Sequence, residues 1–409
     1  MATLVAIATA TVLAAWAVLV IVFSRFLQAI WQEPVFRVPI LIFESDDWGP
    51  APAEHATILS SIADVLRPFR DAQHHPPVMT LGVILAVPEI RSRASKAIEE
   101  VTLMEPQFAP ILASMRAGVS DGVFHLHLHG RSHYWPDALR RACEGDPTVV
   151  GRLGGMESWR TEDLPSGLQS RYGPEINGTP FPISDDAVRL ASEGEARLFH
   201  NCFGAKPLVA VPTTFVWRPA VEAGWAAGGV RVIVTPGHYY RDRDEFTRPH
   251  SAPIITNGMR SNGLVYIVRD RYFEPYKGHT AADGLQAMAQ NTSLGRPTLL
   301  EIHRVNFIED SLRRRSLSTI DALVRRAISA YPDVRFLSTL ELAEAIKART
   351  PDLIDDSLST RLTTWCARAR SELRFWKLAR LTGLALFVRM LGAVIRRMPR
   401  RNLSLSKVT

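Results

Sequence analysis

The chain has 409 residues, of which 46% are hydrophobic and 22% are charged, and its formal net charge is +7. This composition excludes a disordered tail, and three widely spaced cysteines give no support for a disulfide framework or a cysteine-based zinc site. The basic excess lies after Arg361, while the remainder carries more acids than bases, so we expect no nucleic-acid partner.

The chain begins with an uncharged apolar run from residue 2 to residue 23, long enough to cross a bilayer as a helix. We predict a transmembrane anchor over residues 1–24, which makes this a single-pass protein of the cell membrane. A cleavable signal peptide fits less well, because no basic residue precedes the run. Arg25 and Arg37 follow it, which favours a cytoplasmic body, although large domains translocate regardless of such charges.

Short β-rich apolar runs then alternate with segments that can form helices. Such runs are typical of a parallel sheet buried on both faces, and they predict an α/β barrel over residues 36–348. The expected strands are 38–47, 78–85, 123–130, 208–217, 230–237, 264–270, 298–304 and 334–339. The expected helices are 184–203, 311–331 and 340–348, and residues 145–182 are expected to form a long loop.

A third region, residues 349–409, is expected to begin with a linker at 351–360 and to continue as a basic amphipathic tail. Arg374, Lys377 and Arg380 lie three residues apart, and an uncharged stretch follows them. This pattern favours a helix that lies in the membrane interface, with anionic lipids as its partner, through residues 361–409. A solvated helix that packs on the protein body is the alternative.

Two consecutive acids, Asp46 and Asp47, end the first predicted strand directly after the apolar run ILIF. A double Asp alone is usually a solvated turn or a helix cap. In a parallel α/β barrel, however, catalysis is assembled at the carboxyl ends of the strands. Carboxylates buried at such a position need a charged partner or a metal ion.

The third predicted strand carries histidines in alternation. His125, His127 and His129 share one face of the strand, and His133 follows after a glycine. Imidazoles gathered in a core are costly unless each is hydrogen-bonded or bound to a metal. Together with an aspartate they indicate a catalytic metal site that leaves one position for water, with zinc as the first choice and other divalent first-row metals as alternatives.

Two further strand ends complete the pattern. Arg218 follows an apolar run and precedes a proline, and His303 ends the seventh predicted strand with Glu301 on the same face. Each residue alone is a weak signal, because a lone Arg or His is more often part of a surface ion pair. The order Asp-Asp, His-x-x-x-His, Arg-Pro and His at successive strand ends is a strong signal.

In these motifs the chain resembles the polysaccharide deacetylases, metal-dependent carbohydrate esterases with a distorted (β/α)7 barrel, over residues 38–346. The resemblance implies that Asp47, His129 and His133 hold the metal. It also implies a general base at Asp46 and a general acid at His303.

The same resemblance makes Arg218 the residue that orients Asp46. The chain departs from the family pattern at Trp48, where the family usually has glycine, and we expect Trp48 to contact the substrate. The family's aspartate that braces the acid histidine has no clear counterpart, so we propose Glu301 for that role. We expect His125 and His127 to support the metal ligands or to replace one of them.

We therefore expect a membrane-anchored, metal-dependent deacetylase that removes an acetyl group from an amino sugar of a cell-surface or lipid-linked glycan. A glycoside hydrolase on a related barrel, with Asp46 and Glu301 as its two carboxylates, is one alternative. A non-catalytic protein of polysaccharide assembly that only binds glycan is another. Metal dependence separates the first alternative from the deacetylase, and acetate release separates the second.

Overall fold

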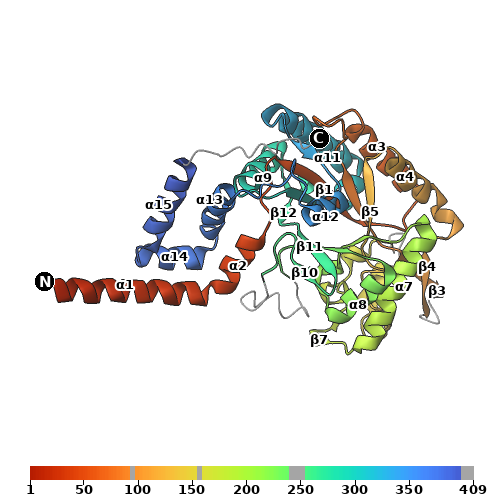
Figure 1. Cartoon of the computed structure of the whole chain (residues 1–409). Coiled ribbons are helices and arrows are strands. Elements are labelled where there is room, and N and C mark those ends of the chain that lie inside the picture. Colours follow the sequence, from red (N-terminus) through yellow and green to blue (C-terminus); the bar gives the residue numbers. More distant parts are fainter. Residues whose placement is uncertain (93–96, 154–158, 239–253, 398–409) are drawn as a thin grey trace, which may run out of the picture.

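The computed structural model describes residues 1–92, 97–153, 159–238 and 254–397. These residues form a curled, mostly parallel sheet with helices on its outside, and a smaller group of helices that carries both ends of the chain (Figure 1). The mixed α/β architecture expected from the sequence is confirmed.

The main sheet has ten strands among the described residues, in the order β10-β11-β9-β8-β5-β2-β1-β13-β12, and β14 pairs with β1. The strand pairings among the described residues of this sheet are parallel, except that of β10 with β11. Because no pairing joins β12 to β10 in the described chain, the sheet is a half-barrel that stays open. The strands are β1 (Ile40–Trp48), β2 (Met79–Val83), β5 (Phe124–Leu128), β8 (Val209–Ala210), β9 (Val232–Thr235), β10 (Arg260–Ser261), β11 (Leu264–Val268), β12 (Arg271–Tyr272), β13 (Thr298–His303) and β14 (Arg335–Phe336).

Every strand expected from the apolar runs has a counterpart in this sheet. The run 208–217 is strand only at β8, because a 3-10 helix, η4 (Thr213–Phe215), follows it. The sequence did not predict the hairpin of β3 (Ala86–Ser92) and β4 (Ala97–Thr102). The expected loop 145–182 is wrong in part, since it holds α6 (Pro147–Leu153), two 3-10 helices, η2 (Thr161–Asp163) and η3 (Ser166–Leu168), and the hairpin of β6 (Glu175–Ile176) and β7 (Thr179–Pro180).

Most of the helices lie along the outer face of the sheet, whereas α12 (Thr339–Ala348) packs against the inward residues of β1. The three predicted helices are confirmed as α7, α11 and α12, with ends within a residue or so of the expected ones. The helices around the sheet are α3 (Glu54–Leu66), α4 (Ala109–Ser120), α5 (Pro136–Gly145), α7 (Asp185–Phe203), α8 (Pro219–Gly228), α9 (Ala281–Ser293), α10 (Val305–Ile308), α11 (Asp310–Ala330) and α12 (Thr339–Ala348).

The inner face of the half-barrel changes character along the strands. On β1, Ile40 and Ile42 pack in an apolar cluster that includes residues of α12, whereas Leu41 and Phe43 face the cluster beneath the outer helices. Two residues further along the inward face come Glu44 and then the acids of the double Asp. The amino-terminal half of the interior is therefore a packed apolar core, and its carboxyl-terminal half is lined by charge.

A separate group of five helices, which we call the anchor module, lies at the other end of the molecule (Figure 1). Trp16 donates a hydrogen bond from Nε1 to the carbonyl of Thr382 at 2.8 Å, and its ring lies 5.7 Å from that of Phe387. The two chain ends therefore pack together. The helices are α1 (Ala2–Val22), α2 (Ser24–Gln32), α13 (Leu358–Ala369), α14 (Leu373–Leu381) and α15 (Leu384–Arg397).

Within α1, residues Thr3–Val22 are apolar and long enough to cross a membrane, with a mean hydropathy of 2.6 and little burial against the protein. A signal sequence can have the same length and hydropathy. Of the tail predicted over 361–409, residues 398–409 lie outside the described part of the chain. The described remainder is helical.

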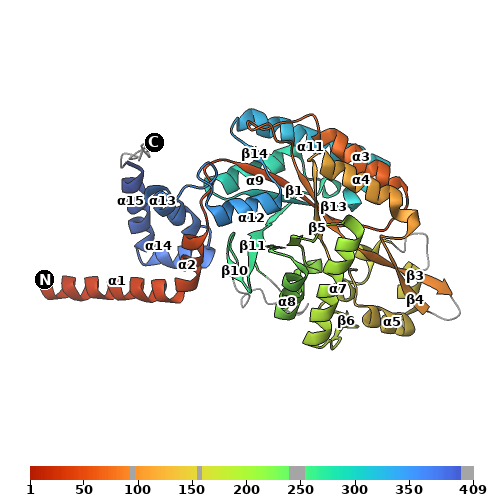
Figure 2. The same cartoon turned by 45° about the vertical axis from the view of Figure 1, so that its right-hand side comes forward.

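The anchor module is hydrogen-bonded to the half-barrel through Arg368. Arg368 on α13 is fully buried and donates hydrogen bonds to five backbone carbonyls, those of Ile30, Glu33, Pro34, Leu294 and Gly295. The segment expected to be a linker, 351–360, forms an isolated bridge between Ile354 and Phe36. Figure 2 shows β3, β4, α5 and β6, which follow the carboxyl ends of the sheet strands, on the side away from α1.

Candidate metal centre and active site

A cleft of about 430 Å³ opens at the carboxyl ends of the strands. Its lining is rich in titratable side chains drawn from strands far apart in sequence, because parallel strands that curl into a barrel bring their carboxyl ends together. The lining residues are Asp46, Asp47, His129, His133, Glu162, Asp163, Gln169, Pro212, Thr214, Phe215, Arg269, Tyr272, Tyr276, Lys277, Glu301, His303 and Val305.

A β-bulge at the end of β1 brings both members of the double Asp into this cleft. Between Ser45 and Trp48, β1 advances by one residue more than its partner β2. Asp47 takes the extra place with a φ of 74°, a left-handed conformation that aspartate tolerates better than most residues. Strict alternation would send Asp46 and Asp47 to opposite faces, so the bulge is what allows both carboxylates to serve one site.

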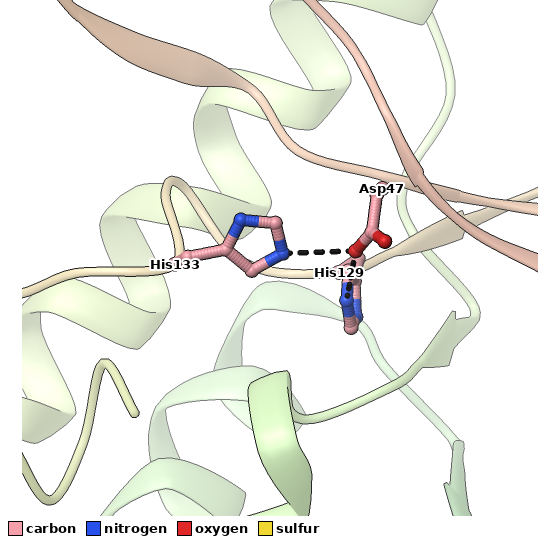
Figure 3. A group of neighbouring side chains, drawn as sticks. All are labelled: Asp47, His129 and His133. Atoms are coloured by element: carbon pink, nitrogen blue, oxygen red, sulfur yellow. Dashed lines mark hydrogen bonds and ion pairs between the residues drawn. The ribbon is translucent and has the colours of Figure 1, made fainter. Parts of the chain in front are cut away.

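The three predicted metal ligands converge on one point. They are Asp47, His129 and His133, and their ligand atoms lie within 4.8 Å of one another. Asp47 Oδ1 is 3.0 Å from His133 Nε2 and 3.5 Å from His129 Nε2, so the carboxylate lies between the two rings (Figure 3). All three side chains are buried. This donor set matches the three protein ligands of a catalytic zinc site.

The far side of each imidazole is already occupied. His129 Nδ1 lies 2.8 Å from the carbonyl of Val211, and His133 Nδ1 lies 2.7 Å from the hydroxyl of Thr161. Histidines that bind a metal usually use their second ring nitrogen in this way, which fixes the tautomer and points Nε2 at the ion. The residues present therefore fit a divalent metal such as zinc.

The electrostatics of the group favour a cation. Burial opposes ionisation of Asp47, but hydrogen bonds with His129 and His133 hold its pKa well below its usual range. Burial also opposes protonation of His129, yet the carboxylates of Asp46 and Asp47 raise the pKa of its ring. The same negative field that attracts a proton to the imidazole would attract a divalent metal in its place.

Asp46 is paired with Arg269 and not with Arg218. Arg269 Nη2 lies 2.6 Å from Asp46 Oδ2, and although burial raises the pKa of the carboxyl, this guanidinium lowers it to about 2. Arg218 instead donates hydrogen bonds to Asp185 and to the carbonyl of Ile183. The prediction that Arg218 orients the base is wrong, because Arg269 at the end of β11 holds that place.

Arg269 holds a buried carboxylate network together. Its guanidinium lies 3.1 Å from Glu301 and 3.4 Å from Glu44, in addition to its bond to Asp46. Burial raises the pKa of Glu44 to about 7, against the effect of Arg269 and of a hydrogen bond from Thr339. Because three acids share one base, Arg269 stays charged, and its pKa is raised despite its burial.

A glycine leaves the space that Asp46 occupies. A Cβ built on Gly82 of β2 would collide with Asp46 Oδ1. Gly82 pairs in register with His127 on the next strand, so this position cannot move away easily. The glycine is therefore needed for the orientation of the carboxylate, and its role does not depend on a positive φ.

His303 is braced by Glu274 and not by Glu301. His303 Nδ1 hydrogen-bonds to Glu274, whose carboxylate also accepts a bond from Asn306. Burial lowers the pKa of His303, but the bond with Glu274 and the carboxylates of Asp47 and Glu301 raise it to about 10. Glu301 is 3.4 Å from Nε2 on the other side of the ring and pairs with Arg269. The substitute role predicted for Glu301 is therefore wrong.

The remaining predicted site residues lie outside the cleft lining. His127 is fully buried, neither of its ring nitrogens has a hydrogen-bond partner among the described residues, and Glu44 is 4.0 Å away. His125 lies deeper, with its ring 5.4 Å from that of His127. Neither belongs to a group of side chains that could hold a metal in the described chain.

Trp48 is 1% exposed, donates a hydrogen bond to Ser45, and packs against His55 and Phe307. A side chain so deeply buried cannot touch a substrate. The prediction of a substrate contact at Trp48 is therefore wrong, and the bulge explains why, since it turns Asp47 toward the cleft and the next side chain into the core.

Two important residues of the site, Arg269 and Glu274, were absent from the sequence predictions. Arg269 was identifiable, because it ends the apolar run LVYIV as the double Asp ends ILIF. Glu274 had no such signal. It lies in a short connection after β12, and only the parallel pairing of β12 with β13 brings it beside His303.

No family model matches the chain, and no curated protein matches it in sequence. Among solved structures, a peptidoglycan deacetylase from Bacillus subtilis is 11% identical with a TM-score of 0.36, covering 78% of this chain and 93% of that one. A family 4 acetyl xylan esterase from Clostridium thermocellum, in complex with a cobalt ion, is 10% identical with a TM-score of 0.33, covering 74% and 89%.

A 4-alpha-glucanotransferase from Thermococcus litoralis is 8% identical with a TM-score of 0.41. It is matched by 75% of this chain, which spans only 40% of its length. The solved structures that this chain resembles thus include deacetylases and carbohydrate esterases, the class that the sequence motifs resemble, and a glucanotransferase.

Proposed function

We propose that the protein is a metal-dependent deacetylase that hydrolyses the acetamide of an amino sugar in a glycan. The observation that carries the proposal is the convergence of Asp47, His129 and His133 on one point. Beside them lie a carboxyl group with a lowered pKa, Asp46, and an imidazole with a raised pKa, His303. A site with an ionised base, a protonated acid and three metal ligands has what amide hydrolysis requires.

Asp47, His129 and His133 would hold the ion, and a divalent metal at that position polarises an acyl oxygen and lowers the pKa of a bound water. Asp46 is ionised at neutral pH, because its pKa is about 2. Arg269 engages its Oδ2 and leaves Oδ1 to accept the proton of the attacking water. The new bond forms between that water oxygen and the acetyl carbon.

His303 is assigned to the departing nitrogen. An amine leaves as a neutral group only if it gains a proton as the carbon–nitrogen bond breaks, and His303, with a pKa of about 10, carries that proton at neutral pH. Its Nδ1 is bonded to Glu274, so Nε2 is the atom that donates. The products are acetate and a free amino sugar.

The test is acetate release from chitotetraose by the full chain in detergent, with metal content measured on the same samples. We expect stoichiometric metal and metal-dependent release in the wild type, and loss of both in the double variant His129→Ala, His133→Ala. Asp46→Asn should keep the metal and lose turnover. Turnover that survives in Asp46→Asn, or in protein stripped of metal, would contradict the proposal.

The two alternatives predict other outcomes. A glycoside hydrolase needs one of its two carboxylates to protonate the glycosidic oxygen, whereas Asp46 is ionised at neutral pH and both Asp46 and Glu301 pair with Arg269. Cleavage of chitotetraose into shorter sugars without metal would nevertheless establish that activity. Binding of glycan by metal-loaded protein with no acetate released from any acetylated sugar would establish the binding-only alternative.

We further propose that the anchor module attaches the enzyme to a membrane, through α1 and through the helices that pack beside it. Trp16 lies six residues before the end of α1, about 9 Å along the helix, and contacts α15 at that level. Helices α14 and α15 thus lie alongside the apolar helix. They expose the large apolar side chains Leu373, Leu378, Leu381, Leu386, Phe387 and Met390.

Basic residues occupy the same helices. Arg380 and Arg389 lie over the ring of Trp376, at 5.9 and 5.6 Å, close to the exposed apolar side chains. Apolar and basic groups side by side suit the interface of a membrane with anionic lipids. Arg25 and Arg37 follow α1, which also favours a cytoplasmic location for the half-barrel. The substrate would then be a lipid-linked or nascent glycan on the cytoplasmic side of the membrane.

Site-specific labelling tests this attachment, because the three native cysteines are buried. We expect an environment-sensitive dye at Phe387→Cys, in the full chain in nanodiscs, to be quenched by spin-labelled lipid. The same dye at Leu190→Cys, an exposed apolar position on α7, should stay in water. Equal quenching at both positions would contradict the attachment, and protease access in sealed inverted vesicles would determine the side.

A further inference from the structure

One wall of the cleft carries a lysine between two tyrosines. The ring of Tyr272 stacks on that of His303, 6.3 Å between centroids and 21° between planes. Lys277 Nζ lies 6.0 Å from the centroid of Tyr272 and 5.2 Å from that of Tyr276. The amine of Lys277 therefore lines the same cleft as His303, with the ring of Tyr272 beside both.

This wall is held in place by its backbone. The amide of Tyr276 donates to the side chain of Asn306 at 3.0 Å, and the amide of Lys277 donates to the carbonyl of Glu274 at 2.9 Å. Asn306 also bonds to the carboxylate of Glu274, which braces His303. The segment that positions the acid thus also positions Lys277.

The charges around the cleft leave Lys277 uncompensated. Arg269 pairs with Asp46 and Glu301, and Asp47 lies between the imidazoles of His129 and His133. Two further acids line the cleft, and Glu162 pairs with Arg304 at 2.8 Å while Asp163 pairs with Arg160 at 2.7 Å. In the described chain, no ion pair is found for Lys277, whereas each carboxylate that lines the cleft has a cationic partner or metal-binding neighbours.

The lysine is charged at neutral pH. A hydrogen bond with Tyr276 raises its pKa against the opposing effect of burial, and the nearby carboxylates of Glu274 and Glu301 raise it further. Both tyrosines are exposed, Tyr272 by 60% and Tyr276 by 37%, so the cation stands beside open aromatic faces. Aromatic faces pack against the apolar faces of sugars, and an exposed ammonium attracts an anionic oxygen group.

We propose that Tyr272, Tyr276 and Lys277 form a subsite for an anionic group, carboxylate or phosphate, carried by the substrate next to its acetylated sugar. This inference rests on the proposed function for the identity of the reacting unit. It names the substrate class as anionic glycans, because Lys277 lines the cleft without an ion-pair partner among the described residues. The two tyrosines supply the surface on which that unit stacks.

The experiment measures dissociation constants with the full chain in detergent, metal-loaded and silenced by Asp46→Asn. A tetrasaccharide of hyaluronan, with carboxylates, is compared with neutral chitotetraose, and N-acetylglucosamine 1-phosphate is compared with methyl N-acetylglucosaminide. We expect at least one anionic probe to bind about fivefold more tightly than its neutral match, the scale of an exposed ion pair. The pair that shows the preference identifies carboxylate or phosphate as the group recognised.

Variants of the lysine decide the assignment. In the same background, Lys277→Met should abolish the preference for the anionic probe, and Lys277→Arg should retain it. Lys347→Met, on α12 away from the cleft, is the matched control and should leave the preference intact. Equal affinities for anionic and neutral probes, or a preference that survives Lys277→Met, would overturn the proposal.

The outcome is separable from that of the deacetylase proposal. A Lys277-dependent preference without acetate release from any probe by the wild type would keep the subsite and reject the deacetylase. Metal-dependent acetate release with no Lys277-dependent preference would keep the deacetylase and reject the subsite.

Discussion

The cleft and the anchor module each bury an arginine completely, and they neutralise it in opposite ways. Arg269 in the half-barrel is surrounded by the carboxylates of Glu44, Asp46 and Glu301. Arg368 in the anchor module donates mainly to backbone carbonyls and has one carboxylate, Glu33, at 3.4 Å. The pKa of Arg269 is raised, whereas burial lowers that of Arg368 to about 10.

The two arginines therefore have different roles. Arg269 compensates full charges, and one of them, Asp46, takes part in the proposed chemistry, so its loss would change the charge of the site. Arg368 compensates dipoles of the segments that join α2 to β1 and α9 to β13, so its loss would loosen the connection between module and half-barrel. The first is tied to activity and the second to stability.

The largest effect should come from Arg269→Met. Removing the guanidinium deprives three buried carboxylates of the cation that they share, which should cost about 3 to 5 kcal/mol of stability and abolish turnover. Thermal unfolding in detergent and acetate release measure the two effects. Arg269→Lys is the control that keeps the charge and should recover part of the stability. Normal turnover in Arg269→Met would contradict the role of Arg269 in the activity.

Arg368→Met should destabilise the protein by about 3 kcal/mol, because five carbonyls and Glu33 lose their donor. Molecules that remain folded should keep full activity per bound metal, since Arg368 does not line the cleft. Unfolding curves and activity normalised to metal content check both statements. Arg361→Met, which removes a partly exposed arginine of the same helix, should cost much less.

Gly82→Ala tests the position of Asp46 separately from the charge of the cleft, because it displaces this carboxylate without removing a charge. The added Cβ collides with Asp46 Oδ1, and a shift of about 1 Å in a catalytic group costs about a hundredfold in kcat. Metal content should stay stoichiometric. Gly145→Ala, where a Cβ meets open space, is the matched control. An unchanged kcat in Gly82→Ala would show that Asp46 is not the base.

Glu274→Gln should have the smallest effect and the most specific one. Its carboxylate helps to raise the pKa of His303 to about 10, so the amide variant should move the alkaline limb of the pH–kcat profile toward lower pH. The stabilisation linked to this raised pKa is fully present below the unfolded value of about 6.5 and is lost as pH rises through about 10. An unmoved alkaline limb would remove His303 from the role of acid.

Much of the fold was predictable because strand signals are local. Every predicted strand has a counterpart in the sheet, and the even positions of β1 face inward as the period of two requires. The short pieces were missed for the same reason. β10, β12 and the β6–β7 hairpin have two residues per strand, too few for a periodic pattern to appear.

The sequence alone was enough to predict which strand ends carry chemistry, because Asp46, Asp47, His129, His133 and His303 lie at or shortly after the ends of apolar runs, and all five line one cleft. Tertiary structure alone decided which charges compensate one another. Asp46 is separated from Arg269, and His303 from Glu274, by stretches of chain that no local pattern spans. A buried charge is neutralised by whichever group the sheet brings within a few ångströms, and that proximity is set by strand order and register.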